Sequence, residues 1–385
     1  MIGKTGISTN AFIENQTVEG SDPESAEVGQ LPSSSVQGLA SSVYSLATGS
    51  ETPSSFGKKI KKSKYLDSGV KRLFILALAP DTKESYVNLK SILDALKVFE
   101  SNEDFTIASD MKLFSILLGI QQHSSTYPCI WCEGEKNEYD PNAPLRTLGR
   151  CREFAKQYKV AVAEAELNGK KVPLPKDFMC CQHEPLLPGP DHMEVLDILP
   201  PPELHLMTGV SFHIFKEIAK EMGEKLAYQW LKKYFGKVDS SKGFKGKTFL
   251  KKANEMSCCR TPKFPRRLMK FIHTLQKFNK VVESCFGNEL KKDEYEENIH
   301  AFTISYMALG ISVTPKVHCV FRHVPEFCKR KGCGLGVYSE QVIEACHSDL
   351  WKIEQWYPTN LETDPKCDEK MLKKVTRYNG LRLFP

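Results

Sequence analysis

An acidic residue and a cysteine pair stand close together in segment 105–132, FTIASDMKLFSILLGIQQHSSTYPCIWC. Asp110 ends an apolar run typical of a short strand and precedes a helical pattern, which is where open α/β sheets present ligands. The same position suits a helix N-cap, because a carboxylate there accepts a backbone hydrogen bond. Cys129 and Cys132 form a CxxC pair that offers two thiolates to a metal ion. The segment therefore predicts a carboxylate site beside half of a metal site.

Two histidines far along the chain offer the other half of that metal site. His318 and His323, in HCVFRH, have the H-x4-H spacing allowed for zinc. On a regular helix they would point about 140° apart, so we expect a loosened turn near Pro325 to bring them together. A CxxC pair alone also fits a redox pair, and a single histidine also fits a protein core. The four residues together predict structural zinc.

The other cysteines are read as thiols. Cys180–Cys181 and Cys258–Cys259 are adjacent pairs with poor ligand spacing, so we expect both to be buried. The chain holds 13 cysteines in 385 residues, an odd number that favours a reducing compartment over a disulfide framework. No apolar run approaches the roughly 20 residues of a membrane span, and the N-terminus lacks a signal-peptide pattern. We therefore expect a nuclear or cytoplasmic protein without a membrane partner.

A third group of chemistry-bearing residues lies in segment 338–356, YSEQVIEACHSDLWKIEQW. Glu340 and Glu344 are four residues apart on one face of the predicted helix, and His347 follows within one turn. A carboxylate on this helix could bind a divalent metal together with Asp110. A solvated acidic helix face is the alternative interpretation.

The net charge of +6 is distributed unevenly. Residues 1–57 are rich in serine and acidic residues and lack apolar periodicity, which is typical of a disordered tail. A basic run, KKIKKSK at 58–64, follows. Residues 230–280 carry 15 Lys or Arg against two acids, a charge excess that favours binding to a phosphate backbone. The aromatic residues among them have helical spacing, which favours a place in the core. The cations that we assign to nucleic-acid binding are Lys232, Lys233, Lys245, Lys247, Lys251, Lys252, Arg260, Arg266 and Arg267.

The predicted elements give a small α/β unit followed by many helices. Val70–Ala79 reads as a buried strand, a helix starts at Asp81, Phe105–Ser109 reads as a second strand and Met111–Ile120 as a second helix. This β-α-β-α order favours parallel strands. Helical patterns follow at 148–167, 203–223, 227–235, 246–256, 262–286, 292–309 and 338–356. The fold class is therefore α+β, mostly helical.

Three segments carry a resemblance to a known family. SDMKLFSILLGIQQHSSTYPCIWC, KVHCVFRHVPEF and SEQVIEACH resemble the catalytic core of Transib-type transposases and of the V(D)J recombinase large subunit. The resemblance covers roughly residues 66–350. In this range the sequence also resembles transposon-derived proteins of invertebrate genomes. It implies an RNase H-like core with a DDE carboxylate triad, interrupted by a helical zinc-binding insertion.

The resemblance also implies roles for individual residues. Asp110 would be the second triad acid and Glu344 the third, with Glu340 as the alternative. ELHLMTGVSFHIFKEI at 203–218 resembles a further family segment, which makes His205 an additional candidate. The implied zinc ligands are Cys129, Cys132, His318 and His323. Magnesium or manganese would bind the carboxylates, DNA would be the substrate, and the protein would act as a homodimer.

The chain departs from the family pattern at the first triad acid. Asp67 precedes the first predicted strand and Asp81 is assigned to a helix cap, so no acid fills that place. A two-metal site that lacks a bridging carboxylate should lose most of its activity. We therefore expect a truncated or decayed transposase-derived DNA-binding protein. The expected regions are a tail at 1–65, a partial RNase H-like core at 66–128, a helical zinc-binding insertion at 129–335 and a C-terminal helical segment at 336–385.

Two other functions remain open. An active DNA transposase would need a first acid elsewhere in the chain. A di-iron carboxylate oxidase is suggested by the ExxH pairs Glu297/His300 and Glu344/His347. The second alternative lacks clear partner glutamates and leaves the CxxC pair without a role.

Overall fold

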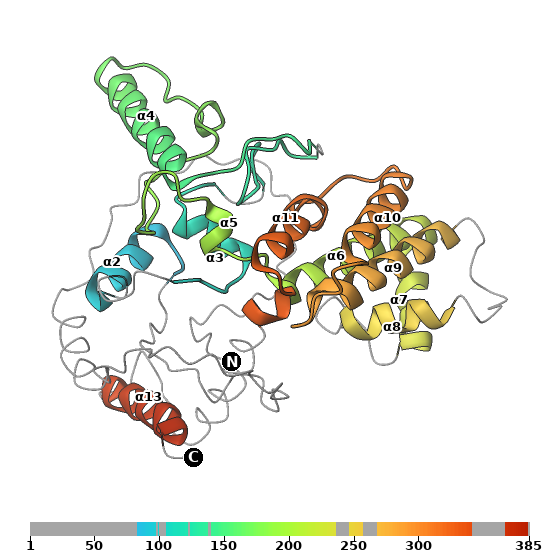
Figure 1. Cartoon of the computed structure of the whole chain (residues 1–385). Helices are drawn as coiled ribbons and strands as arrows, with labels where there is room; N and C mark the ends of the chain where they lie inside the picture. Colours follow the sequence, from blue (N-terminus) through green and yellow to red (C-terminus); the bar gives the residue numbers. More distant parts are fainter. Residues whose placement is uncertain are drawn as a thin grey trace. The chain divides into compact units, whose positions relative to one another are not determined.

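The computed structural model is mostly helical, and no sheet is present among the residues that it describes (Figure 1). The described residues are 83–97, 99, 105–121, 124–137, 140–235, 246–256, 268–340 and 366–383. The chain divides into two compact units, one of residues 104–341 and one that combines residues 1–103 with 342–385.

The larger unit contains the helices that position the candidate site. They are α3 (Met111–Leu117), α4 (Leu148–Leu167), α5 (Val195–Ile198), α6 (Glu203–Met222), α7 (Glu224–Phe235), α8 (Gly246–Met256), α9 (Met269–Val281), α10 (Tyr295–Met307) and α11 (Pro315–Lys331). Short 3-10 turns, η2 (Pro175–Phe178) and η6 (Leu335–Tyr338), and a π-helical turn, η5 (Val282–Phe286), join them. The smaller unit contains α2 (Tyr86–Leu96) and α13 (Cys367–Leu383).

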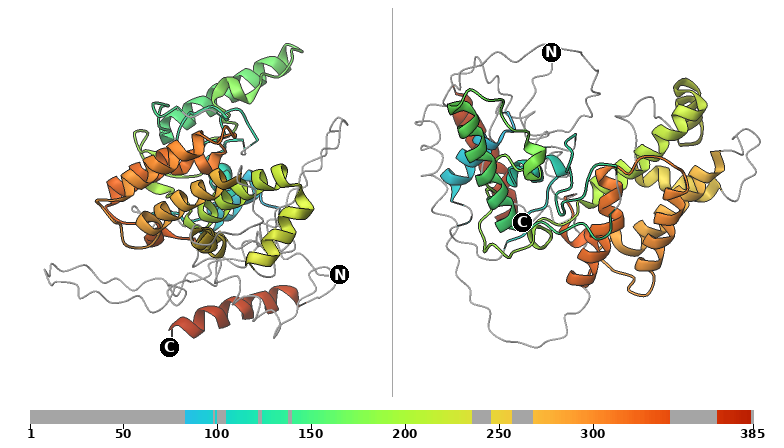
Figure 2. Two further views of the ribbon diagram at one scale, coloured as in Figure 1. Left: turned by 90° about the vertical axis from the view of Figure 1, so that its right-hand side faces the viewer. Right: turned by 90° about the horizontal axis from the view of Figure 1, so that it is seen from above.

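Helices α6 to α11 form a bundle around an aromatic core (Figure 2). Helix α9 packs between α8 and α10, and α6 contacts α7, α8 and α11. Phe278 and Phe302 lie 4.9 Å apart between ring centroids, and Tyr306 and Phe321 lie 5.5 Å apart. All four rings are buried, and burying an aromatic side chain contributes roughly 1.5–3 kcal/mol. This core fixes the position of α11, which carries the two candidate histidine ligands.

Side-chain caps fix the starts of three helices near the site. Asp110 Oδ1 accepts a hydrogen bond of 2.8 Å from the Leu113 N–H at the start of α3. Thr147 caps α4 and Thr314 caps α11 in the same way. Such caps contribute about 1 kcal/mol each by satisfying a backbone donor that the helix leaves unpaired. Helix α4 extends away from the bundle and has η2 as its main helical neighbour (Figures 1 and 2).

Most of the predicted helices are present in the described part of the chain, whereas the second predicted strand is not. The segment 105–109 is not a strand; it is an extended connection whose Ile107 N–H donates to the Ile198 carbonyl. Within the described part of the chain, this segment therefore pairs with the turn at α5. The helix expected from Asp81 begins at Tyr86 with Ser85 as its cap. The predicted strand at 70–79 and the tail at 1–57 lie outside the described residues.

The aromatic residues of segment 230–280 are core residues wherever the structure describes their side chains. Trp230, Phe249, Phe271 and Phe278 are all buried, as their helical spacing predicts. The described cations of the same segment instead lie on the outside of α7, α8 and α9, so the two residue types separate cleanly.

Candidate metal centre

Four side chains from two distant segments meet inside the larger unit. Cys129, Cys132, His318 and His323 place their ligand atoms within 4.8 Å of one another. Cys129 Sγ lies 3.2 Å from His323 Nε2, and Cys132 Sγ lies 3.2 Å from His318 Nε2. None of the four is more than 5% exposed. The two halves that the sequence predicted as one site do come together.

The CxxC loop is held by the residue inside it. Trp131 is completely buried, and its Nε1–H donates to the Leu199 carbonyl at 2.6 Å. Its ring lies 6.4 Å from the Phe114 ring on α3 and 5.4 Å from the His323 ring. The indole therefore joins the loop to α3, to the turn after α5 and to the histidines of α11.

Both histidines project from one regular helix. Helix α11 continues without a break through Pro325, so the loosened turn that we expected near this proline is wrong. The two imidazoles still approach one another, with ring centroids 5.2 Å apart. Each imidazole faces a different cysteine, and the length of the two side chains makes up for their angular separation on the helix.

Electrostatics in the cluster favour metal binding. Hydrogen bonds from Cys129, His318 and His323 lower the pKa of Cys132 to about 2 despite burial. Burial and the neighbouring Cys132 raise the pKa of Cys129 well above its usual value. Burial lowers the pKa of His323, which keeps this imidazole neutral. The cluster thus favours a deprotonated Cys132 and a neutral His323, the forms in which these side chains bind a cation.

The donor set fits zinc. Zinc binds thiolates at about 2.3 Å and imidazoles at about 2.0–2.1 Å in a tetrahedron, so neighbouring ligand atoms should lie about 3.3–3.8 Å apart. The cluster is close to that spacing before any adjustment. Two sulfurs, two nitrogens and deep burial are typical of a closed structural site, because a catalytic site keeps one position open to solvent.

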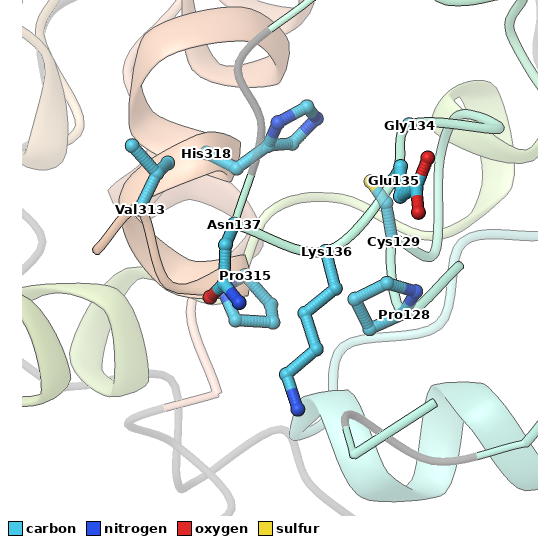
Figure 3. A pocket seen from close by; sticks show the side chains of 9 residues that line it. All are labelled: Pro128, Cys129, Gly134, Glu135, Lys136, Asn137, Val313, Pro315 and His318. Carbon is cyan, nitrogen blue, oxygen red and sulfur yellow. The ribbon is translucent and has the colours of Figure 1, made fainter. Parts of the chain in front are cut away.

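A shallow pocket borders the cluster, and Cys129 and His318 contribute to its lining (Figure 3). Gly134 lies at this border. A Cβ atom at position 134 would stand 3.2 Å from both Cys132 Sγ and His318 Cε1. The absence of a side chain at this position leaves room for the two ligand atoms to meet.

The candidate carboxylates lie in a different environment. Glu340 is 2% exposed, and its Oε1 accepts from the His205 backbone N–H and faces His205 Nδ1, both at 2.9 Å. Glu340 lies in a turn after η6, and residues 341–356 of the helix that we expected lie outside the described residues. Its other oxygen, Oε2, is buried and has no hydrogen-bond partner among the described residues.

A lysine accompanies these acids. Lys316, in the first turn of α11, is largely buried, and burial lowers its pKa while Asp110 and Glu340 raise it. Its side chain crosses α6 at Gly209, where a Cβ atom would collide with it. Gly209 is one helical turn from His205, so the lysine amine and the Glu340 carboxylate lie along the same face of α6. Nothing in the sequence pattern identified Lys316, because a single lysine before a helix is usually exposed.

The remaining predicted site residues are only partly described. Glu344 lies outside the described residues, as do Lys245, Arg260, Arg266 and Arg267. Lys232, Lys233, Lys247 and Lys251 are exposed, and the side chain of Lys252 is not described. Cys180 and Cys181 are buried thiols as predicted, whereas Cys258 and Cys259 lie outside the described residues.

The di-iron alternative gains no support. Glu297 and His300 are both exposed on α10. Within the described part of the chain, the Cys129 cluster is the single group of three or more ligand-type residues. Glu344 and His347 lie outside that part.

The comparisons with known proteins leave the family open. No protein-family model matches the chain, and a search of curated proteins finds no match. No helix in the described segments is long and apolar enough to cross a membrane. The cluster itself is therefore the main structural guide to function.

Proposed function

We propose that this chain is a transposase-derived DNA-binding protein in which a structural zinc ion joins the CxxC loop to α11 and the carboxylate site is degenerate. The observation that carries the proposal is the meeting of the four implied ligands. The members of each Cys–His pair are 186 and 194 positions apart in the chain, yet they meet in one buried cluster. Unrelated CxxC and H-x4-H motifs would have no reason to converge.

Bound zinc would cross-link the two halves of the larger unit. Residues of the chain position both halves of the site for the metal. Trp131 anchors the CxxC loop, Thr314 caps the start of α11, and the aromatic core of the bundle fixes the helix that carries the histidines. The metal then neutralises the thiolates that the fold has buried. Its role is to hold the scaffold rather than to react.

Lys316 supports the inactive assignment. A two-metal strand-transfer site needs carboxylates that face divalent cations. Burial lowers the pKa of Lys316, and Asp110 and Glu340 act against that shift, so the lysine serves as a counter-charge to both acids. Glu340 also accepts a backbone hydrogen bond and faces an imidazole. An RNase H-like core with its triad intact would instead leave these acids to the metals.

DNA binding is assigned to the outer side of α7 and α8. Lys232 and Lys233 stand in the last turn of α7, and Lys247 and Lys251 stand one turn apart on α8. The two helices pack against each other. Exposed cations on adjacent helices can release counterions from a duplex without reading its sequence. This role places the protein in the nucleus, and sedimentation with and without duplex would test the homodimer that the resemblance implies.

Metal analysis tests the zinc assignment. We expect about one zinc per chain in purified protein, and its loss in Cys132→Ser but not in Cys333→Ser. Cys333 is a suitable control because it is a free cysteine outside the cluster. Two irons per chain, or a metal content that Cys132→Ser leaves unchanged, would refute the assignment.

A nicking assay with manganese tests the inactivity. We expect no cleavage of a duplex carrying transposon ends. Cleavage that disappears in Asp110→Ala would show an active transposase instead.

Salt dependence of duplex binding tests the DNA surface. Replacing Lys247 and Lys251 by serine should reduce the slope of log affinity against log salt by about 0.9 for each phosphate that the protein no longer neutralises. Lys170 and Lys171, exposed after α4, provide the matched control because the same charge is removed elsewhere. Equal slopes for the two double variants would contradict the assignment.

A further inference from the structure

Arg146 is a buried arginine directly behind the CxxC loop. It lies just before α4 and is 1% exposed, which makes it one of the largest fully buried side chains of the protein. Burying a guanidinium away from water is costly unless its donors and its charge are both satisfied. The hydrogen-bond acceptors and charges around its guanidinium therefore indicate the role of Arg146.

The donors of Arg146 are satisfied mainly by the loop that carries the two cysteines. Nε donates to the carbonyls of both Cys129 and Cys132, each at 3.0 Å. Nη2 donates to the Tyr127 carbonyl at 3.3 Å and to the Met179 carbonyl at 3.2 Å. One planar group thus ties together three carbonyls of the segment from Tyr127 to Cys132.

The backbone of Arg146 holds the side chain in place. Its N–H donates to the Trp131 carbonyl at 2.9 Å, and its own carbonyl accepts from the Val195 N–H at 3.0 Å. The residue therefore lies between the CxxC loop and the start of α5. It has little freedom to move when the loop changes.

The guanidinium of Arg146 also lies among cysteine side chains. Besides the carbonyls, its guanidinium faces Cys181 Sγ, at 3.7 Å from Nη1. The acid of the adjoining loop, Glu133, is engaged in two hydrogen bonds with Arg150 at 2.7 and 2.8 Å. Burial lowers the pKa of Arg146, but Cys181, Cys151, Cys129 and Glu133 act against burial, and the pKa is raised. The guanidinium is thus a fixed positive charge among buried thiols.

We propose that Arg146 is the positioning residue of the metal centre: it fixes the CxxC loop in its ligating geometry through its hydrogen bonds to the loop carbonyls. This inference rests on the proposed zinc site. Hydrogen bonds to the main chain of the ligands hold the two sulfurs at the separation that a tetrahedral ion requires. Lysine would keep the charge of Arg146 but not the planar fork that reaches several carbonyls at once.

The test compares Arg146→Lys with Arg150→Lys. Arg150 is the matched control, because its side chain is 46% exposed and contacts the same loop through Glu133. Zinc affinity is measured by competition with a chelating dye, and geometry by the absorption spectrum of the cobalt-substituted protein. We expect Arg146→Lys to lose roughly 10–100-fold in zinc affinity with an altered cobalt spectrum. Arg150→Lys should stay within about threefold of the wild type, because exposed ion pairs contribute little.

A measurement on the unmodified protein covers the case in which Arg146→Lys does not fold. In 15N-labelled wild type, the Arg146 Nε–H signal should shift on zinc addition while the Arg150 Nε–H signal stays in place. Unchanged affinity and cobalt spectrum in a folded Arg146→Lys, or an Arg146 signal that ignores zinc, would overturn the role of Arg146. A wild type that binds no zinc would overturn the proposed metal site itself, so the two failures are distinguishable.

Discussion

Removing the metal should destabilise the larger unit by several kilocalories per mole. The ion would link Cys132 to His318 across 186 positions of the chain. If the metal is treated as a cross-link, closing a loop of this length removes unfolded-state entropy worth about 5 kcal/mol at 25 °C. Mass action gives a similar value, since free zinc at about 1,000 times its dissociation constant stabilises the bound fold by about 4 kcal/mol. Cross-linking and mass action thus lead to a stabilisation of the same size.

The assay is thermal unfolding followed by far-UV circular dichroism, with and without a strong chelator. For a unit of roughly 150–250 residues, 1 kcal/mol corresponds to about 2–4 °C. We therefore expect the chelator to lower the melting temperature by roughly 8–20 °C. Cys132→Ser should melt near the chelated wild type and should not respond to the chelator, whereas Cys333→Ser should behave like the wild type.

A wild type whose melting temperature ignores the chelator would refute the reasoning, provided that metal analysis shows the zinc has left. If the chelator destabilised only a small part of the helical signal, that result would also contradict the cross-link. A cross-link between the loop and the bundle requires both to lose stability together.

Three further predictions follow from single residues. Gly134→Val should weaken zinc binding by about 1–3 kcal/mol in dye competition, because the added side chain must displace Cys132 Sγ or His318; unchanged affinity would contradict the close approach. Burial lowers the pKa of His213 below that of an unfolded histidine, so the unfolded state takes up the proton first and stability falls as the pH drops below about 6.5. Urea titrations of metal-free protein should show less of this acid loss in His213→Asn, and an equal loss would reject the assignment. Lys316→Met should bind more Mn2+ than the wild type, as measured by electron paramagnetic resonance. Equal Mn2+ binding by the two proteins would contradict the role of Lys316 as a counter-charge.

Local patterns in the sequence were enough to predict the helices and the metal ligands. Helical periodicity placed α4 and α8 closely, and the type and spacing of the cysteines and histidines identified the cluster. These features depend on neighbours within a few turns or on the fixed chemistry of a ligand. The bend that we expected at Pro325 was wrong because side-chain length, rather than backbone distortion, closes the gap between the imidazoles.

The features that were missed depend on long-range packing. Segment 105–109 has the composition of a strand, but a strand needs a partner strand, and among the described residues the Ile107 N–H donates to the Ile198 carbonyl of a turn. Lys316 and Arg146 look like ordinary surface cations in the sequence. Each is buried because of groups supplied from elsewhere in the chain, which no local pattern reveals.

The burial of Arg146 and Lys316 bears on the order in which the site forms. Cysteine side chains and Glu133 act to raise the pKa of Arg146, and Asp110 and Glu340 act to raise the pKa of Lys316, so each cation has its charge partners within the fold. A buried cation without its anion is strongly unfavourable, so each pair is favourable only when the fold is complete. Arg146 donates hydrogen bonds to the carbonyls of Cys129 and Cys132, the two cysteines that zinc would bind. Metal binding and the burial of Arg146 should therefore stabilise each other, and the loop should be ordered fully only when both are in place.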